Sequence, residues 1–115
     1  MSDYKQLFGN KEEEVLAIFS TLLDFLHDLG PFDIEVKKTS LHLVKEKAFL
    51  GVHPKKKWLD LNIVSNQAID HPLITKNEQV SKNRWHNNLR LSSVEEVDDT
   101  VKKLTSGSLS ALRSL

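Results

Sequence analysis

The sequence predicts an α+β domain, a two-layer sandwich in which an antiparallel meander sheet of four to five strands carries N-terminal and C-terminal helices on one face. Hydrophobic residues recur at spacings of three and four near both ends of the chain, and they alternate with polar residues between those ends. The alternating segments are joined by short connections, which favour antiparallel neighbours because a parallel pair needs a long crossover. Helices with one apolar stripe and a sheet with one apolar face can then cover each other in two layers.

Length and composition predict a single domain over residues 1–115. The chain has no cysteine, which excludes a disulfide framework and thiolate chemistry and agrees with a cytoplasmic location. Its 16 basic and 16 acidic residues give a formal net charge of zero, which argues against a dedicated nucleic-acid or membrane binder. Charges interrupt every apolar run well before the ~18 residues that a membrane span needs.

The first expected element is a helix over residues 10–29. Consecutive glutamates in its first turn suit the positive end of the helix dipole, and Asn10 is expected to cap the free amides there. Gly30 and Pro31 are expected to end the helix, because glycine adopts a left-handed stop and proline cannot continue a helix. Seven apolar residues form its buried face at helical spacing: Val15, Ile18, Phe19, Leu22, Phe25, Leu26 and Leu29.

Residues 33–64 change to a period of two and are predicted to form a meander of strands. Turns are expected at residues 45–47 and 53–56, with Pro54 at the first corner of the second turn. The apolar side of this sheet is expected to carry the alternating hydrophobic residues Ile34, Val36, Leu41, Leu43, Ala48, Leu50, Val52, Leu59, Leu61 and Ile63.

The last third of the chain is predicted as loop, strand and helix. Residues 65–83 have weak periodicity and are expected to form a long loop with one short helical turn. A strand is expected over residues 84–91, and a helix over residues 93–115 that is kinked or broken near Gly107. The sequence from Ser93 to Glu96 has the pattern of a capping box, in which the two side chains bond each other's backbone amides.

The basic residues are concentrated in the middle of the chain. Residues 1–30 carry two lysines and six acidic residues, whereas residues 31–58 carry seven lysines and three acidic residues. Lysines in turns also keep sheet edges soluble, which is the simpler interpretation. The alternative is an anion-binding sheet face, on which Phe49 and Trp58 would offer stacking surfaces. Its candidate residues are Lys38, Lys47, Lys55, Arg84, His86 and Arg90.

Other chemistries have little support in the residue patterns. No two of the five histidines have the spacing that aims both at one metal ion, so neither a metal site nor a cofactor is predicted. There is no Gly-x-Ser-x-Gly motif, and the four glycines never cluster into a phosphate-cradling loop. No catalytic residue is therefore predicted.

One short motif leaves an enzymatic alternative open. Glu35 and Lys37, with Asp33 upstream on the same strand, resemble the Glu-x-Lys pattern with which many nucleases hold Mg²⁺. That chemistry needs carboxylates that converge on the metal ions. Alternating charge on a solvated strand explains the same residues, so a metal-dependent nuclease-like enzyme is the remote alternative.

The chain also resembles a family of small bacterial domains of unknown function, over nearly its whole length from Val15 to Leu104. The resemblance is carried by ordered stretches: EVKKTS (35–40), KAFLGVHPKK (47–56), LDLNI (59–63), and RW followed by LRLSSVEEVD (84–98). Members of that family stand alone or form the C-terminal part of larger predicted transport or DNA-processing proteins.

The resemblance implies shared elements rather than shared chemistry. These elements are the strand around Phe49, the Arg84-Trp85 entry to the last strand, and the capped final helix. Where relatives tend to have histidine before the apolar pair of that strand, this chain has Asn87 and Asn88. The resemblance implies no catalytic residues for this chain, and a histidine-dependent activity is not expected here.

The expected function is therefore that of a non-enzymatic binding or interaction module that uses the open or basic side of its sheet. The alternative is a binder of an anionic small ligand or of nucleic acid through a face lined by lysine and arginine. The partner is unknown; a protein or a second copy of the chain is expected before nucleic acid, and a membrane is not expected.

Overall fold

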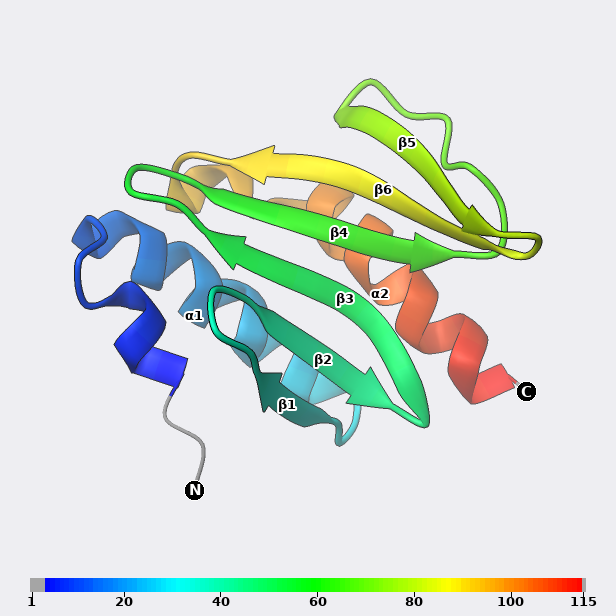
Figure 1. Cartoon of the computed structure of the whole chain (residues 1–115), viewed down its shortest axis with the longest axis horizontal. Helices are drawn as coiled ribbons and strands as arrows, with labels where there is room; N and C mark the ends of the chain where they lie inside the picture. The colour runs from blue at the N-terminus through cyan, green and yellow to red at the C-terminus, as the bar shows by residue number, and fades with distance from the viewer. Residues whose placement is uncertain (1–3, 115) are drawn as a thin grey trace.

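A computed structural model describes residues 4–114, and the side-chain surroundings of residues 4–106. The described part of the chain contains two α-helices, six β-strands and two short 3₁₀ helices (Figure 1). In chain order they are η1 (Tyr4–Phe8), α1 (Glu13–Leu29), β1 (Asp33–Val36), β2 (Leu41–Lys45), β3 (Lys47–Pro54), β4 (Leu59–Ser65), β5 (Ile74–Ser81), β6 (Arg84–Leu91), η2 (Val94–Glu96) and α2 (Asp99–Ser114).

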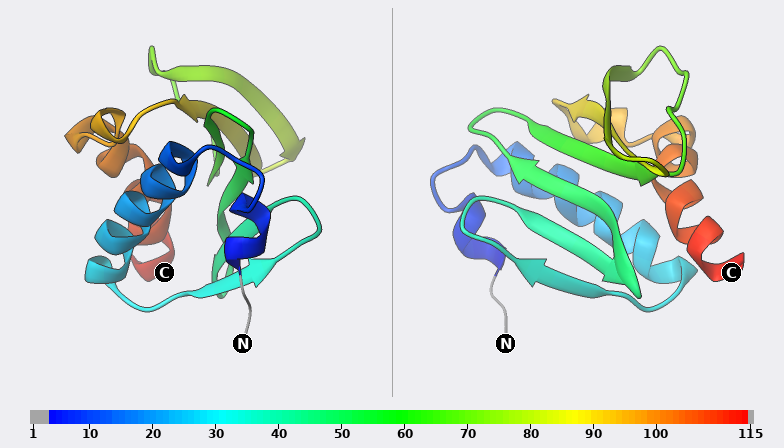
Figure 2. Two further views of the ribbon diagram at one scale, coloured as in Figure 1. Left: turned by 90° about the vertical axis from the view of Figure 1, so that its left-hand side faces the viewer. Right: turned by 45° about the vertical axis from the view of Figure 1, so that its right-hand side comes forward.

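The six strands form one sheet in the order β1-β2-β3-β4-β6-β5, and every neighbouring pair is antiparallel. Both α-helices cover the same face of this sheet, and the other face, here called the open face, is free of them (Figures 1 and 2). The predicted α+β class and antiparallel sheet are confirmed. The predicted strand number was wrong, because the sheet has six strands rather than four to five.

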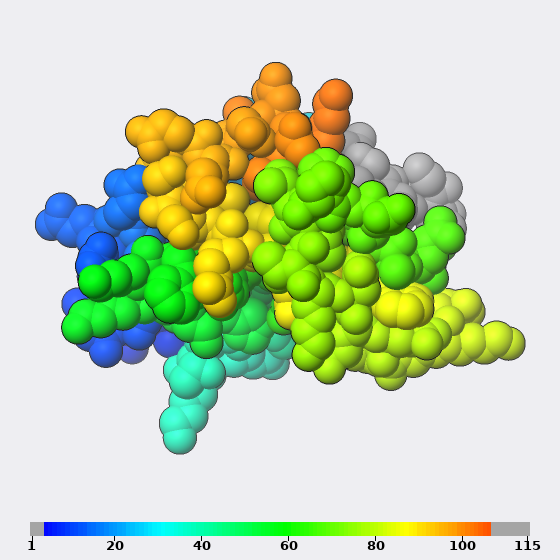
Figure 3. Space-filling model, turned by 90° about the horizontal axis from the view of Figure 1, so that it is seen from above, coloured from blue at the N-terminus to red at the C-terminus, as the bar shows by residue number. Residues whose placement is uncertain are grey.

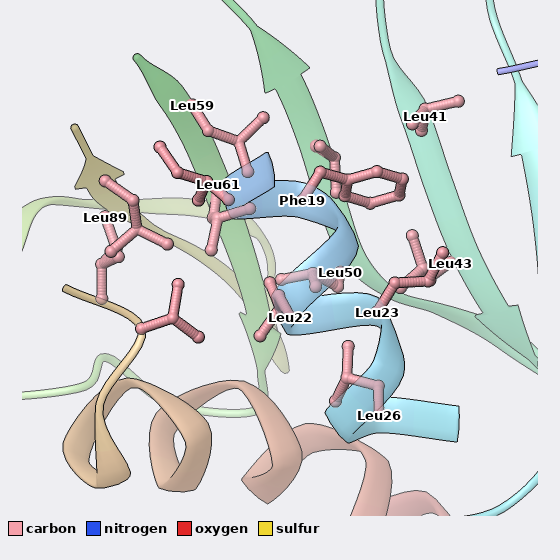
Figure 4. Close-up of a cluster of buried hydrophobic side chains, with 14 of the residues drawn as sticks. Phe19, Leu22, Leu23, Leu26, Leu41, Leu43, Leu50, Leu59, Leu61 and Leu89 are labelled. Atoms are coloured by element: carbon pink, nitrogen blue, oxygen red, sulfur yellow. The ribbon is translucent and has the colours of Figure 1, made fainter. Parts of the chain in front are cut away.

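The hydrophobic core lies between the helices and the sheet. Figure 4 shows leucines of the central strands meeting Phe19, Leu22, Leu23 and Leu26 of α1. Each such side chain stabilises the fold by roughly 1.5–3 kcal/mol when it is removed from water. The core contains seven of the residues expected on the apolar side of the sheet: Leu41, Leu43, Leu50, Val52, Leu59, Leu61 and Ile63. Leu89 and Leu91 of β6 are buried with them. Val36 on the edge strand is instead 37% exposed, and Ala48 is only half-buried.

The start of α1 differs from the prediction. The helix begins at Glu13 after the separate turn η1, and its N-cap position is Glu12 rather than Asn10. The Asn10 side chain instead accepts a hydrogen bond from Nζ of Lys11 at 2.9 Å. The Glu12 amide donates to the carbonyl of Lys56, which ties the helix start to the β3–β4 turn. At the other end Gly30 has a φ of 149°, which a side chain would disfavour.

A β-bulge breaks the alternation of β3. The register shifts between Leu43 and Val44 of β2, so that β3 has one extra residue there. As a result the consecutive residues Phe49 and Leu50 are both buried in the core. Phe49 is only 1% exposed and meets Phe32 edge-on, so the expectation that it offers a stacking surface was wrong.

The turn after β3 is also displaced by two residues from the prediction. Pro54 is the last residue of β3, and the Lys55 amide donates to the carbonyl of Trp58 at 2.8 Å. Lys56 and Lys57 therefore form the corners of the turn, where Pro54 was expected at the first corner.

The predicted loop over residues 65–83 contains an additional strand, β5. This strand lies outside β6, so that β6 pairs with β4 and the chain departs from a simple meander. Figure 3 shows β5 and the segment before it at the outer surface above β6. Nearly all residues of β5 are exposed. Because the strand has no buried face, its sequence carries no hydrophobic alternation that could have predicted it.

The C-terminal helix begins later than predicted and is not broken where expected. The capping box between Ser93 and Glu96 is present, but it opens the short turn η2. The α-helix starts at Asp99, where the carboxylate of Asp98 accepts from the Val101 amide at 3.0 Å. The helix then continues through Gly107 to Ser114. The helix is therefore not broken at Gly107, because a single glycine weakens a helix without ending it.

Candidate anion-binding site

A polar pocket of about 270 Å³ lies at one end of the sheet. Three segments that are far apart in sequence meet there: η1 with the residues that follow it, the β1–β2 connection, and the β3–β4 turn (Figure 2). The described residues that line this pocket are Gln6, Leu7, Asn10, Lys11, Lys38, Thr39, His53, Pro54 and Lys55.

The pocket lining is basic. It includes three lysines and one histidine, and none of the described lining residues is acidic. Three ammonium groups around one hollow create a positive potential, so a bound anion is attracted and a bound cation is repelled. Thr39, Gln6 and Asn10 add hydroxyl and amide groups that can donate hydrogen bonds to an anion without changing the charge, and Leu7 and Pro54 complete the lining.

Short backbone hydrogen bonds place two of the lysines. The Lys37 amide donates to the Ser40 carbonyl at 2.8 Å, which closes the β1–β2 connection and sets Lys38 at its tip. The hydrogen bond from the Lys55 amide closes the β3–β4 turn in the same way. The β2–β3 register, in which Leu41 faces Val52, brings both connections to the same end of the sheet.

The third lysine comes from the N-terminal segment. Tyr4 and Phe8 of η1 pack their rings against Phe19 of α1, at centroid distances of 5.2 and 5.5 Å. The Lys11 amide then donates to the Phe8 carbonyl, so the segment passes beside the sheet end before α1 begins. Lys11 could not be predicted from the sequence as a site residue, because its neighbours match a helix start.

His53 joins the pocket to the open face. Its Nε2 lies 2.9 Å from Nδ2 of Asn62 on β4, so the amide donates and the ring nitrogen accepts. Burial, mainly, and then the positive charge of Lys55 lower the pKa of His53 below its usual 6.5, although Asp60 opposes this change. The ring is therefore neutral at pH 7 and gains a positive charge only in acid.

The structure brings only part of the predicted anion site together. Lys38 and Lys55 line the pocket. Lys47 and Arg84 lie at the opposite end of the sheet, beside the β2–β3 hairpin and the start of β6. Between Lys47 and Pro54 the length of β3 is about 23 Å, at 3.3 Å per residue. The six predicted residues thus do not form one continuous surface.

Arg90 lies on β6 at the pocket end and has two partners. Its Nε donates to Oδ1 of Asp60 at 2.9 Å, and its guanidinium carbon lies 4.4 Å from the ring centroid of Trp58. The indole nitrogen of Trp58 donates to the other carboxylate oxygen of Asp60 at 3.2 Å. One carboxylate thus holds both the arginine and the tryptophan.

His86 is a poor candidate for an anion contact. Its Nε2 is buried and has no hydrogen-bond partner. Burial, mainly, and the charge of Arg84 lower the pKa of His86, with Glu78 acting in the opposite direction. The ring is therefore neutral at pH 7 and supplies no positive charge to the open face.

The nuclease-like motif does not form a metal-binding cluster in the described part of the chain. Asp33 and Glu35 lie on the edge strand β1, and Glu35 pairs with Lys37 at 3.5 Å. Among the described residues, no three histidine or acidic side chains come together as a metal site would require.

The same described part contains no helix that is long and apolar enough to cross a membrane.

A family model for a domain of unknown function, DUF5655, matches residues 4–106, which include the pocket and all six strands. The chain belongs to the DUF5655 family. The comparisons with curated proteins and with solved structures give no match. The DUF5655 family name assigns no activity, so a functional hypothesis for this member depends on the pocket itself.

Proposed function

We propose that this domain is a non-enzymatic binding module that holds an anionic small ligand in the basic pocket. The observation that carries the proposal is the convergence of Lys11, Lys38 and Lys55 on one hollow whose described lining contains no acidic residue. Because these lysines come from three separate segments, the fold and not a local lysine run concentrates the charge.

The size and chemistry of the pocket favour a small ligand group. Its volume of about 270 Å³ lies near the lower end of ordinary ligand pockets. Lysine binds phosphate or carboxylate as a point charge and does not require one geometry. Since Lys38 and Lys55 are exposed, salt screens part of the attraction, and we expect weak binding at high ionic strength.

The proposal also includes the cellular location of the domain and the kind of protein in which it acts. We place the protein in a bacterial cytoplasm, as its lack of cysteine and its resemblance to bacterial domains suggest. A recognition module would also suit the C-terminal position that similar domains occupy in predicted transport or DNA-processing proteins.

The test is a titration of the ¹⁵N-labelled protein with inorganic phosphate at low and high salt, followed through backbone amide shifts. We expect saturable shifts at residues 10–11, 38–39 and 53–55 that weaken as salt increases. Replacing Lys38 or Lys55 by glutamine should lower the phosphate affinity about three- to tenfold, because each change removes one charge of a site with modest screening.

The matched control is Lys47→Gln, which removes the same charge from the opposite end of β3. This variant should bind phosphate as the wild-type protein does. Equal losses in Lys38→Gln and Lys47→Gln would show that only the overall charge matters and would contradict a specific pocket. An absence of shifts at low salt would overturn the proposed function.

A further inference from the structure

Beside the pocket, the structure contains a second feature that fits one class of anionic ligand. We propose that the stacked pair of Arg90 and Trp58 receives an aromatic base, so that the ligand is a nucleotide with its phosphate in the pocket. The inference rests on the proposed function, because it assigns the second half of the ligand that the pocket holds.

The first step is that the guanidinium of Arg90 is held in place. Asp60 accepts from Nε of Arg90 at 2.9 Å and from the indole nitrogen of Trp58 at 3.2 Å. The guanidinium also lies over the Trp58 ring at 4.4 Å. An arginine restrained by a carboxylate and an aromatic ring loses less conformational entropy on binding than a free surface arginine does.

The second step is that this arginine is still accessible. The Arg90 side chain is 54% exposed, although Trp58 covers one face of its guanidinium and Asp60 occupies its Nε edge. Neither of these two partners lies on the face of the guanidinium that points away from the indole. Planar guanidinium groups and aromatic rings are the surfaces on which proteins stack unpaired bases.

The third step is the distance between this pair and the pocket. His53, which lines the pocket, is the register partner of Asp60, and Asp60 is the register partner of Arg90. Neighbouring strands lie about 4.8 Å apart, so Arg90 is about 10 Å from His53 across the sheet. This separation suits a ligand whose aromatic base and phosphate are joined by a sugar.

The charge distribution favours a mononucleotide over a long nucleic-acid strand. Lys47 and Arg84 lie at the far end of the sheet, and the net charge of the chain is zero. A backbone that runs across the open face would thus meet no continuous row of positive charges, which binding of a strand normally requires. A single phosphate needs only the pocket.

The experiment compares adenosine 5′-monophosphate, inorganic phosphate and adenosine as probes of the full chain. The variant Trp85→Phe leaves Trp58 as the only tryptophan, so that its fluorescence reports on stacking. We expect adenosine monophosphate to quench Trp58 and to bind about tenfold or more tightly than phosphate, which is the usual contribution of one stacked base. Adenosine alone should bind weakly.

Arg90→Lys separates stacking from charge, because it keeps the cation and removes the planar group. This variant should lower the affinity for adenosine monophosphate to that for phosphate and leave phosphate binding unchanged. Lys38→Gln should weaken both ligands. The matched control Arg84→Lys makes the same change at the opposite end of the sheet and should affect neither ligand.

The outcomes distinguish this inference from the proposed function. Equal affinities for adenosine monophosphate and phosphate would overturn the stacking site and leave the anion pocket standing. Binding of neither probe would overturn both. A single-stranded oligoadenylate offers several copies of the same base and phosphate. If its affinity exceeds the statistical gain expected from that number of copies, a strand and not a mononucleotide is the occupant.

Discussion

Asn87 shows how one buried polar residue connects several parts of this fold. It is fully buried, and Oδ1 accepts from the Ile69 amide and from Nδ2 of Asn77. Its own Nδ2 donates to the Ile63 carbonyl and to Oγ of Ser65. All hydrogen-bonding positions of the amide are thus occupied, and the loop before β5, β4 and β5 itself are joined through one side chain.

Replacing Asn87 by leucine should lower the free energy of unfolding by about 2–3 kcal/mol. The substitution keeps a similar volume but leaves the Ile69 amide and its neighbours without their partner. Urea denaturation measures the change. The control is Asn88→Leu at the adjacent position on the open face, which should change the free energy by about 0.5 kcal/mol or less. Equal effects in the two variants would contradict the role of the buried network.

At the same scale, His53 and His86 make stability depend on pH. Both have a pKa below 6.5 in the folded protein, mainly through burial. As the pH falls, these histidines therefore take up protons in the unfolded chain before they do so in the folded protein. The folded state loses stability from about pH 6.5 downward, and the loss continues until the pH is below the lowered pKa values of the folded protein. Above about pH 6.5 both histidines are neutral in the folded and unfolded states, so they cause no loss of stability there.

We expect the urea midpoint of the wild-type protein to decrease between pH 7.5 and pH 5. The decrease should be smaller in the double variant His53→Gln/His86→Gln, because the two groups that take up protons preferentially on unfolding are absent. His27→Gln, on an exposed face of α1, tests whether removal of any histidine has the same effect. A double variant with an unchanged pH dependence would show that other groups cause it.

Among the elements, β5 differs from the central strands because it pairs only with β6 and has almost no buried side chain. Two register shifts further disturb its pairing. Elements with few buried contacts open at a lower free energy than the core does.

Hydrogen–deuterium exchange should therefore show amides of β5 exchanging faster than those of β3 and β4 in the same sample. Asn77→Ala should accelerate exchange in β5 further, since it removes the hydrogen bonds to Asn87 and to the Ile69 carbonyl. Protection of β5 equal to that of the central strands would mean that the edge strand is as stable as the core.

The elements that could be predicted from sequence are those that bury one side. The strands β2, β3, β4 and β6 carry buried hydrophobic residues at alternate positions, and α1 carries an apolar stripe, since burial requires those periods. β5 buries almost nothing and was missed. The bulge at Phe49 was also missed, because it depends on how β2 and β3 pair and not on either strand alone.

For the whole molecule, the candidate site was only partly predictable. Lys55 lies in a turn that the sequence indicates, and Lys38 belongs to the lysine-rich middle of the chain, so both could be named before the structure. Lys11 and Asn10 lie in a segment whose pattern belongs to a helix start, and only the packing of Tyr4 and Phe8 on Phe19 carries that segment to the sheet end.

The sequence by itself determined the two-layer α+β class, the antiparallel pairing of the middle strands and the buried face of the central strands, since these follow from local period and short connections. The tertiary structure alone decided that β6 inserts between β4 and β5, that three distant lysines share a pocket, and that Arg90 meets Trp58 over Asp60. The physical reason is that such juxtapositions come from strand register and from packing across the core, which no single segment encodes.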